Sequence, residues 1–520
     1  MTISIKKMLA ASAAICMTMV QGMLLPVSAQ ESTPDFSDLG AIGVFTEEET
    51  EKIAAAIYQG LAEGQPKISL RGEGMPVIGI DEASTGSLQL VFKTVVSGWD
   101  VGVLTDRRKI MWGANSKGVT SVVPTYLVAP ENYAAEYENM MLKLDEITAE
   151  VDPNLSDLEK ALFLHEWMAE NCSYDYTEYA DPAEENLRHT AYGMLTREKA
   201  VCEGYSQFYT MLLHRVGVNS MIVESQEANH GWNLVEIGDS WYHVDVTGDD
   251  SSNALGRVEH TRFMKSTDAM YAAGLNGSDW TLVDGTPVSE MPVSDQYDNG
   301  GFWDGGGSSM QKLEDGSWVG IYAVEGNETT VQFKTTEVDP VTGEIVEKHL
   351  FHLSDLWYVA GTNQNKWYTS SYAVTDVYQG ILFYTTPYNM MAYNNGNFQW
   401  LFGLTEEQKA DGSAIYGMHI DDGIMYYYTS PDPLSEPTEH MVNLADFSAQ
   451  LGLTDTPQEE TEASTEAPDQ NIGVVDVVAI QRYLLGEDVN VADHAEYDLT
   501  CDGVVDGFDL ALLKRALLTK

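Results

Sequence analysis

One cysteine, Cys202, stands in the stretch "REKAVCEGYSQF", where a basic turn gives way to an amphipathic helix that Gly217 is suited to end. A cysteine acts as a nucleophile when a positive charge stabilises its thiolate and a base lies nearby. The amino-terminal end of a helix provides a partial positive charge, and Gly204 lets another backbone approach closely. The expected chemistry is attack on a carbonyl carbon, with the Cys202 N–H in an oxyanion hole.

The base for such a cysteine is a histidine, and the downstream segment "ANHGWNLVEIGDSWYHVDVT" offers His230 and His243. The segment predicts two antiparallel strands joined by a turn at Gly238 and Asp239. Opposed residues of such a pair share a face, so two of the three plausible registers place His230 and Asp245 on one face, and the third separates them. His243 shares the parity of Asp245 but lies two residues away on the same strand, a poorer arrangement for a hydrogen bond. Spacing alone leaves both histidines open.

The remaining candidates have structural interpretations. His165 falls on the apolar face of a predicted helix and is expected to be a buried histidine. Cys172, at the end of that helix, has no partner motif and is also expected to be structural. Cys16 lies in residues 1–29, a predicted signal peptide that is removed on export. Cys172, Cys202 and Cys501 therefore remain in the mature chain. Their odd number and wide spacing exclude a disulfide scaffold and leave at least one thiol free.

The composition disfavours one class of binding partner, nucleic acids. The 520 residues include 80 acidic and 28 basic side chains, for a formal net charge of -52. A surface this negative repels phosphate backbones, so nucleic acid is not an expected partner. We interpret the charge as solubility outside the cell. The length predicts about three or four domains.

Residues 1–29 predict a secretory signal peptide. Lys6 and Lys7 precede the apolar run "MLAASAAICMTMVQGMLL", and "PVSAQ" offers a cleavage site after Ala29. A lipoprotein interpretation through Cys16 is disfavoured, because Ile15 stands where a small residue is required. No later run is long and apolar enough for a membrane span. We therefore expect a secreted, extracellular protein without a membrane span.

Three elements are predicted ahead of the cysteine in a leader region of residues 30–150. Thr46 and Glu49 form a capping box at the start of a helix. Residues 68–128, including "SLQLVFKTVV" and "VTSVVPTYLV", predict strands. A second helix is expected over roughly residues 131–150.

The predicted catalytic domain covers residues 151–285. Ser156 and Glu159 open its first helix with a capping box. The helix after Cys202 comes next, followed by the strand "VNSMIVES" and the hairpin that carries His230 and Asp245.

Residues 286–450 change in character and predict an all-β region with short aromatic strands such as "GIMYYYTS". Exposed aromatics there would bind sugars, although packing in the sheet core is the favoured interpretation. Residues 451–468, "TDTPQEETEASTEAP" and its surroundings, are acidic and rich in Thr, Glu and Pro, which predicts a linker.

The tail, residues 469–520, contains an internal repeat, "DVVAIQRYLL" and "DLALLKRALL". An EF-hand-like loop with Gly503 at its turn position precedes the second copy, and this register predicts a Ca²⁺ site. In the first copy, a shortened cage of Asp469, Asn471 and Asp476 and a metal-free loop both remain open. The expected ligands of the second loop are Asp498, Thr500, Asp502, the Val504 carbonyl, Asp506 and Asp509.

The blocks "LHEWMAENCSYDY", "AYGMLTREKAVCEGYSQFYTMLLHRVGV", "NHGWNLV" and "WYHVDVT" resemble the transglutaminase-like superfamily in order and spacing. The resemblance implies a papain-like core, in which a helix bearing the cysteine packs on an antiparallel sheet. It also implies Cys202 as nucleophile, His230 as base and Asp245 as the residue that orients the base. Gly231 and Gly248 stand where the family commonly has Ala and Trp. The loss of the bulky Trp bears on substrate preference.

The tail resembles a dockerin, which implies calcium-dependent binding to a cohesin module of a cellulosome-type scaffold. The expected fold class is therefore α+β: a papain-like transglutaminase core, an all-β region and a small α-helical, EF-hand-like dockerin.

The expected function is that of a secreted cysteine enzyme that acts on protein amide bonds through a thioester, without a catalytic cofactor. A peptidase or amidase is favoured over a protein cross-linker. The alternative is a catalytically inactive transglutaminase-like module whose β region binds carbohydrate or protein in a polysaccharide-degrading complex. No carboxylate pair stands out as a glycosidase site.

Overall fold

The structure is a computed structural model in which the chain forms two compact units, Met1–Leu453 and Thr454–Lys520. All described residues belong to the first unit, so the fold reported below is that of this unit alone. The described residues are 34, 36–250, 258–299, 301–303, 308–313, 315–324, 327–338, 345–355, 357–359, 366–368, 372–410, 412–421, 423–431, 435 and 437–453.

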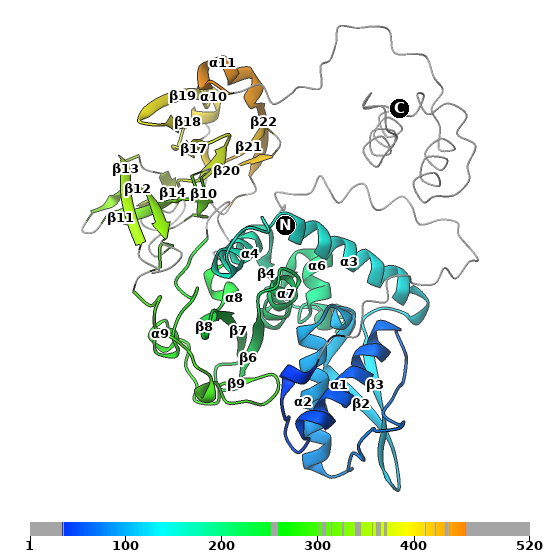
Figure 1. Cartoon of the computed structure of the whole chain (residues 1–520). Helices are drawn as coiled ribbons and strands as arrows, with labels where there is room; N and C mark the ends of the chain where they lie inside the picture. Colours follow the sequence, from blue (N-terminus) through cyan, green and yellow to red (C-terminus); the bar gives the residue numbers. More distant parts are fainter. Residues whose placement is uncertain are drawn as a thin grey trace, which may run out of the picture. The chain divides into compact units, whose positions relative to one another are not determined.

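Two helices and a small antiparallel sheet form the N-terminal region (Figure 1). Helix α1 (Glu47–Ala62) begins with the expected capping box, in which Thr46 accepts a bond from the N–H of Glu49 and Glu49 accepts one from the N–H of Thr46. Helix α2 (Glu82–Gly98) packs beside α1 in one apolar core. The strands, in sheet order, are β1 (Ile68–Ser69), β3 (Gly118–Tyr126) and β2 (Thr105–Asn115).

Helix α2 corrects the strand prediction for "SLQLVFKTVV". That stretch is helical, and the side chain of Asp81 caps it by accepting a bond from the N–H of Ser84. Its β-branched residues favour a strand locally, but its apolar positions follow the helical period, so burial against α1 decides the outcome. The buried apolar residues of α2 are Leu88, Val91, Phe92, Val95 and Val96.

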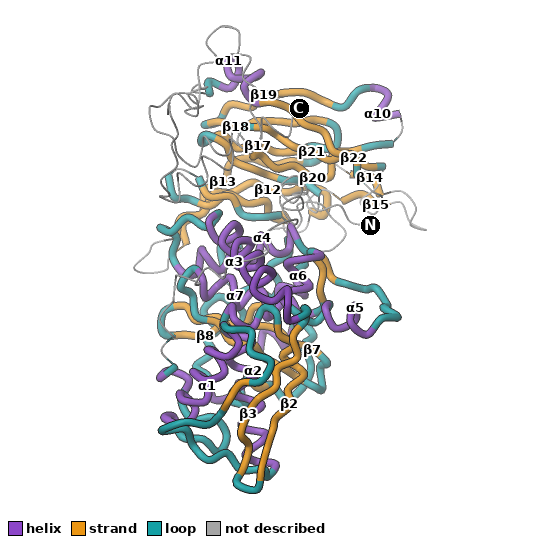
Figure 2. Tube along the Cα trace, turned by 90° about the vertical axis from the view of Figure 1, so that its right-hand side faces the viewer, coloured by secondary structure: helices purple, strands orange, loops and turns teal. Residues whose placement is uncertain are grey.

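Three long helices form the helical layer of the core (Figure 2). Helix α3 (Tyr133–Ala149) confirms the prediction at about residues 131–150. Helix α4 (Asp157–Asn171) begins with both halves of the capping box between Ser156 and Glu159. Helix α7 (Cys202–Arg215) is the third, and the left-handed Gly217 follows its end.

Helix α7 packs on a four-stranded antiparallel sheet of order β8-β7-β6-β9. The amide of Asn233 fastens the two layers, because it donates 3.0 Å to the Ser206 carbonyl and 2.8 Å to the Thr210 hydroxyl. The strands are β6 (Ser220–Ser225), β7 (His230–Ile237), β8 (Ser240–Val244) and β9 (Thr281–Leu282).

Short elements connect these layers. They are β4 (Ser173–Tyr174), α5 (Pro182–Leu187), α6 (Ala191–Arg197), β5 (Lys199–Ala200), α8 (Val246–Asp249) and α9 (Thr267–Ala272). Single 3-10 turns lie at Ser37–Leu39, Asp100–Gly102, Pro130–Asn132, Val288–Glu290 and Leu444–Phe447.

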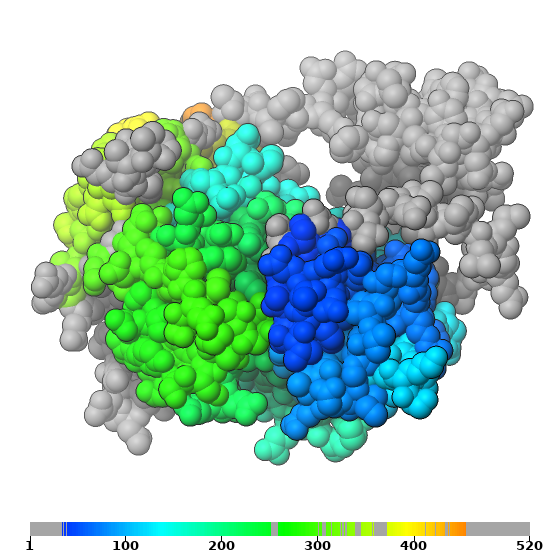
Figure 3. Space-filling model, turned by 60° about the horizontal axis from the view of Figure 1, so that its bottom comes forward, coloured from blue at the N-terminus to red at the C-terminus, as the bar shows by residue number. Residues whose placement is uncertain are grey.

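The N-terminal region lies directly against the core, as the blue and green surfaces in Figure 3 show. Two side chains of α7 bond to the end of α2: the Gln207 amide donates 3.1 Å to the Val96 carbonyl, and His214 Nδ1 lies 2.6 Å from the Gly98 carbonyl oxygen. Helix α7, which carries Cys202, is thus held by α2, which precedes it in the sequence, and by the sheet, whose strands follow it.

Consecutive antiparallel strands build the β region, which confirms the all-β prediction apart from two short helices, α10 (Glu406–Ala410) and α11 (Ser448–Leu451). Trp318, Phe333 and Trp357 are buried there, whereas Phe398 and Trp400 are exposed. The first sheets contain β10 (Gln311–Lys312), β11 (Trp318–Val324), β12 (Asn327–Val338) and β13 (Ile345–Leu353), then β14 (Trp357–Val359) and β15 (Lys366–Tyr368). The last two contain β16 (Thr375–Tyr378), β17 (Ile381–Thr385), β18 (Asn389–Asn394) and β19 (Asn397–Gly403), then β20 (Ala414–Asp421), β21 (Ile424–Ser430) and β22 (Thr438–Asn443).

The start of the β region shares the core of α4 and α7. Trp303 is fully buried in the same apolar cluster as residues of both helices. The Glu159 carboxylate accepts bonds of 3.0 Å from Trp318 Nε1 and 2.9 Å from Lys312 Nζ. The described unit is α+β, as expected.

Candidate active site

Cys202 is the first residue of α7. Val201 precedes the helix as its N-cap and provides no side-chain cap. The first N–H groups of a helix have no acceptor within it, so the N–H of Cys202 is oriented to bind an incoming oxyanion. The chain ahead of Cys202 is held by a bond of 2.8 Å from the Val201 N–H to the Arg188 carbonyl and by parallel pairing of β4 with β5.

The register of the hairpin places His230 and Asp245 on one face. Asn233 pairs with Val244, which is one of the two registers expected to do so. His230 Nε2 lies 2.9 Å from Oδ2 of Asp245. The His230 ring also stacks on Trp232, with 5.6 Å between the ring centroids.

The Cys202 side chain lies beside the His230 ring, close enough to influence its protonation. Nε2 of His230 is bonded to Asp245, so Nδ1 is the ring nitrogen left for the thiol. The structure thus brings together the three residues expected from the sequence, and this arrangement can move a proton between sulfur and imidazole.

Burial is the largest influence on the pKa of His230 and acts to lower it. The charge and hydrogen bond of Asp245, together with the hydrogen bond and charge of Cys202, outweigh burial and raise the pKa to about 10. The imidazolium form is therefore favoured at neutral pH, and it is the form that would accompany a thiolate.

Asp245 directly follows β8 and is the N-cap of α8. It is buried, and its Oδ1 accepts a bond of 3.2 Å from the N–H of Gly248. Its Oδ2 accepts a bond of 2.7 Å from Nη1 of Arg262 in addition to the bond from His230. Burial alone would raise the pKa of this carboxyl, but the charges and hydrogen bonds of His230 and Arg262 lower it, so Asp245 is ionised beside His230.

The other candidate residues have structural positions in the core. Both ring nitrogens of His243 are used in the core, where Nδ1 accepts a bond of 2.9 Å from Trp232 and Nε2 lies 3.1 Å from the Thr267 hydroxyl. His165 is fully buried, and burial lowers its pKa to about 3. Cys172 is also buried, which raises the pKa of its thiol.

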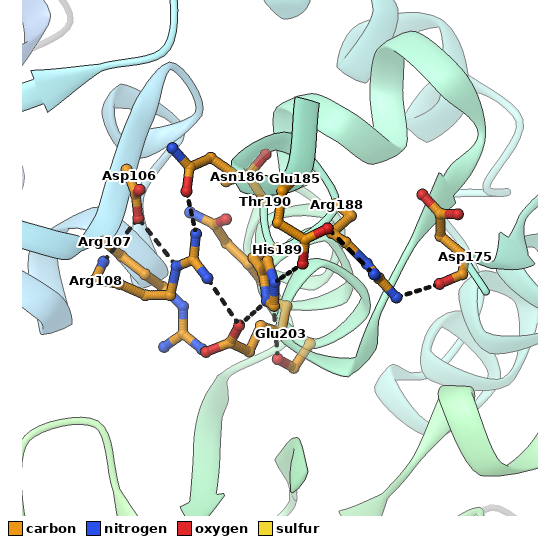
Figure 4. A network of polar contacts seen from close by, with 12 residues as sticks. Asp106, Arg107, Arg108, Asp175, Glu185, Asn186, Arg188, His189, Thr190 and Glu203 are labelled. Carbon is orange, nitrogen blue, oxygen red and sulfur yellow. Dashed lines mark hydrogen bonds and ion pairs between the residues drawn. The ribbon is translucent and has the colours of Figure 1, made fainter. Parts of the chain in front are cut away.

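The residue after the cysteine, Glu203, lies at the centre of a cluster of charges (Figure 4). Its carboxylate is bonded to His189 Nδ1, and the Arg108 and Arg107 guanidiniums lie 3.8 and 4.0 Å away. Burial would raise the pKa of Glu203, but the His189 bond and these cations lower it to about 2. The cluster neutralises a negative charge next to the position where a thiolate would form.

Two of the cations around Glu203 come from β2, which lies outside the predicted catalytic domain. Arg107 is almost fully buried and donates 2.8 Å to the Glu224 carboxylate of β6. Arg108 donates 3.2 Å to the amide oxygen of Asn186. Strand β2 therefore contributes directly to the surroundings of the candidate nucleophile.

Sequence reasoning missed Arg262, Glu203 and this arginine pair. Two adjacent arginines in a chain with few basic residues are a weak signal for a buried charge cluster. Arg262 carries no signal of its own, but the departure at Gly248 marks its position, because the two residues are in contact.

The predicted calcium ligands of residues 498–509, both calcium loops, the linker from residue 454 onward and the signal peptide lie outside the described residues. Within the described part of the chain, no group of three or more His, Cys, Asp or Glu side chains is arranged to hold a metal ion. In that same part, no helix is both long and apolar enough to cross a membrane.

Comparison with known families finds two matches. Residues 144–246 match the transglutaminase-like superfamily, and residues 468–518 match the dockerin type I domain. The chain therefore carries a transglutaminase-like core and a C-terminal type I dockerin, as the two resemblances indicate. Type I dockerins typically bind calcium and a cohesin partner.

Among solved structures, one described as a crystal structure of a TGase has 17% identity and a TM-score of 0.18, and the match covers 27% of this chain. The chain spans 44% of that structure's length. An arylamine N-acetyltransferase of Mycobacterium marinum has 11% identity and a TM-score of 0.16, with coverage of 50% of this chain and 84% of the other. No curated protein sequence matches the chain.

Proposed function

We propose that the protein is a secreted cysteine enzyme that transfers the acyl group of a protein amide through a thioester on Cys202. The observation that carries this proposal is that Cys202, at the start of a helix, lies beside His230, which is hydrogen-bonded to Asp245. The fold alone does not determine which acceptor attacks this thioester, because one fold can host several reactions.

In the acylation step, the Cys202 thiolate attacks the amide carbonyl carbon and a tetrahedral oxyanion forms. The N–H of Cys202, at the positive end of α7, stabilises this oxyanion. The carbon–nitrogen bond then breaks, and the His230 imidazolium gives its proton to the departing amine. Asp245 holds the ring in the orientation that this transfer needs.

In the deacylation step, His230 takes a proton from the acceptor as the acceptor attacks the thioester. Water as acceptor gives a carboxylic acid and restores the thiol, which is the reaction of a peptidase or amidase. A lysine amine as acceptor gives a new amide and is the reaction of a cross-linker. An extracellular site surrounded by water favours hydrolysis, so we propose the peptidase or amidase.

Alkylation of Cys202 tests the triad without knowledge of the substrate. Wild-type protein is treated with iodoacetamide over a pH series, and the labelled residue is located by mass spectrometry. We expect Cys202 to react below the pH at which free cysteine reacts, and His230→Ala to abolish this advantage. A wild-type rate no higher than that of free cysteine would reject the enzyme proposal.

A casein assay separates the two acceptors. Casein is incubated with the protein, with and without a fluorescent amine, and Cys202→Ala serves as the control. Release of new amino termini indicates hydrolysis, whereas incorporation of the amine indicates transfer.

We further propose that the dockerin brings this site to a cohesin module of a scaffold. The second calcium loop, with Asp498, Asp502 and Asp506 among its ligands, is the proposed ion site. Support comes from the dockerin match over residues 468–518 and from the order of these oxygen donors. This tail supplies attachment and no catalytic group.

A second candidate function, a non-catalytic binding module, is favoured by one observation. Phe398 and Trp400 of β19 are more than half exposed, although aromatic side chains of this size are usually buried. An exposed aromatic surface suits the faces of sugar rings. If this is the function, Cys202→Ala retains binding to insoluble cellulose and Trp400→Ala loses it.

A further inference from the structure

Gly248 leaves the space that the Arg262 side chain occupies. A Cβ atom at position 248 would lie 2.3 Å from Nη1 and 2.6 Å from Cδ of Arg262. Gly248 has no left-handed φ, so its backbone conformation is open to other residues. The glycine is therefore required for space, and the group that takes up this space is a guanidinium bonded to Asp245.

The main chain of Arg262 is fixed as firmly as its side chain. Its carbonyl accepts a bond of 3.1 Å from the N–H of Asp245. Its own N–H lies 3.0 and 3.1 Å from the two carboxylate oxygens of Asp249, a fully buried residue that also accepts 2.9 Å from the Thr261 hydroxyl. These main-chain hydrogen bonds fix the position from which the guanidinium reaches Asp245.

We propose that Arg262 is a positioning residue of the active site, which holds the Asp245 carboxylate in place for His230 from the space that Gly248 provides. This inference rests on the proposed function, because it assigns a role within the same triad. It adds a fourth side chain to the three expected from the sequence.

Among the described groups around Asp245, Arg262 is the one that stays positively charged at every pH at which the protein is folded. His230 of β7 and Arg262 share its Oδ2, and Cys202 of α7 acts through His230. The other titratable groups around it are Asp249 of α8, His165 of α4 and His243 of β8. Burial lowers the pKa of both histidines to about 3 and raises that of Asp249 to about 8, so all three groups are neutral between these two pH values.

Removal of Arg262 therefore has a defined effect on pH dependence. Without the guanidinium, the Asp245 carboxyl takes up its proton at a higher pH as the solution is acidified. Protonated Asp245 no longer supports the His230 imidazolium, and the thiolate of Cys202 loses its partner. The acid limb, which is the pH range in which the alkylation rate of Cys202 falls on acidification, therefore moves to higher pH.

The test compares Arg262→Met, Arg262→Lys and Gly248→Ala with wild type in the iodoacetamide assay. We expect Arg262→Met to lower the rate about tenfold in mildly acidic solution and to shift the acid limb upward. Arg262→Lys keeps a positive charge, so its rate should fall less and its acid limb should shift less than in Arg262→Met. Gly248→Ala should reproduce them, because the methyl group displaces the guanidinium without removing a charge.

Gly231→Ala is the matched control, since a Cβ at Gly231 meets no atom closer than 3.5 Å. The double variant Gly248→Ala/Arg262→Met should be no slower than Arg262→Met alone, because both changes remove one contact. Thermal unfolding of each variant separates loss of folding from a shift of the limb. Variants that fold and keep the wild-type acid limb would overturn the inference.

A second readout separates this inference from the proposed function. The imidazole signals of His230 are followed by NMR during a pH titration of wild type and Arg262→Met. A changed titration of His230 supports the link through Asp245 even if Cys202 proves unreactive. An identical titration contradicts the link even if the enzyme proposal holds.

Discussion

Arg107 and Glu224 form an ion pair of 2.8 Å that joins β2 of the N-terminal region to β6 of the central sheet. The Arg107 side chain is 2% exposed. Glu224 also pairs with Lys93 of α2 at 2.9 Å, so two cations of the N-terminal region meet one carboxylate of the core. This region is part of the architecture of the candidate site.

We expect Arg107→Met to lower the free energy of unfolding by about 3 kcal/mol, because it leaves the carboxylates of Glu224 and Glu203 with less compensation. Urea titration measures the change. Lys52→Met, which removes an exposed ion pair with Glu48, is the control and should have a much smaller effect on the free energy of unfolding. Equal losses in the two variants would contradict a central role for Arg107.

The raised pKa of His230 predicts a pH-dependent stability. A group whose pKa is about 10 in the folded chain and about 6.5 in the unfolded chain stabilises fully below about pH 6.5. This contribution disappears as the pH rises through 10. We expect the free energy of unfolding of wild type to fall between these values and that of His230→Gln to fall less. Parallel curves for the two proteins would refute the prediction.

The lowered pKa of Glu203 predicts the opposite dependence. Its contribution to stability is present above about pH 4.3, the value for an unfolded glutamate, and disappears as the pH falls through about 2. Glu203→Gln should therefore be less stable than wild type at pH 6, and the difference should shrink on acidification. Glu131→Gln changes an exposed carboxylate and is the control. Denaturant unfolding at several pH values measures both.

Calcium removal tests the tail independently of the core. We expect EDTA to abolish binding of the full chain to an immobilised cohesin and excess Ca²⁺ to restore it. Asp502→Ala should have the same effect as EDTA. The alkylation rate of Cys202 should not change, because the proposed ion site contains no catalytic residue. Binding that resists EDTA would count against a calcium-dependent dockerin.

Local signals in the sequence predict the elements of the site well. The capping boxes at Thr46 and Ser156 and the hairpin turn at Gly238 depend on a few adjacent residues, and all three are present. The same turn limits the hairpin to three registers, two of which place His230 and Asp245 on one face, and the structure has one of these two. Helix α2 was harder to predict, because its β-branched residues favour a strand until tertiary packing is known.

The supporting charges could not be predicted, because their partners lie far apart in the sequence. Arg107 and Glu224 are 117 residues apart, and Arg262 is 17 residues from Asp245, beyond helix α8. Nothing in a local pattern links such pairs. Gly248 was visible as a departure from a family pattern, but only the position of Arg262 gives that departure a physical meaning.

The burial of Trp303 with α4 and α7 has a consequence for how this module can be exchanged between proteins. The segment that matches the superfamily, residues 144–246, is shorter than the segment that must fold together. A gene fusion that transferred only the matching segment would lose Arg107, Arg262 and Trp303. A segment transferred by gene fusion would therefore have to extend from the N-terminal helices to the first strands of the β region in order to keep these contacts.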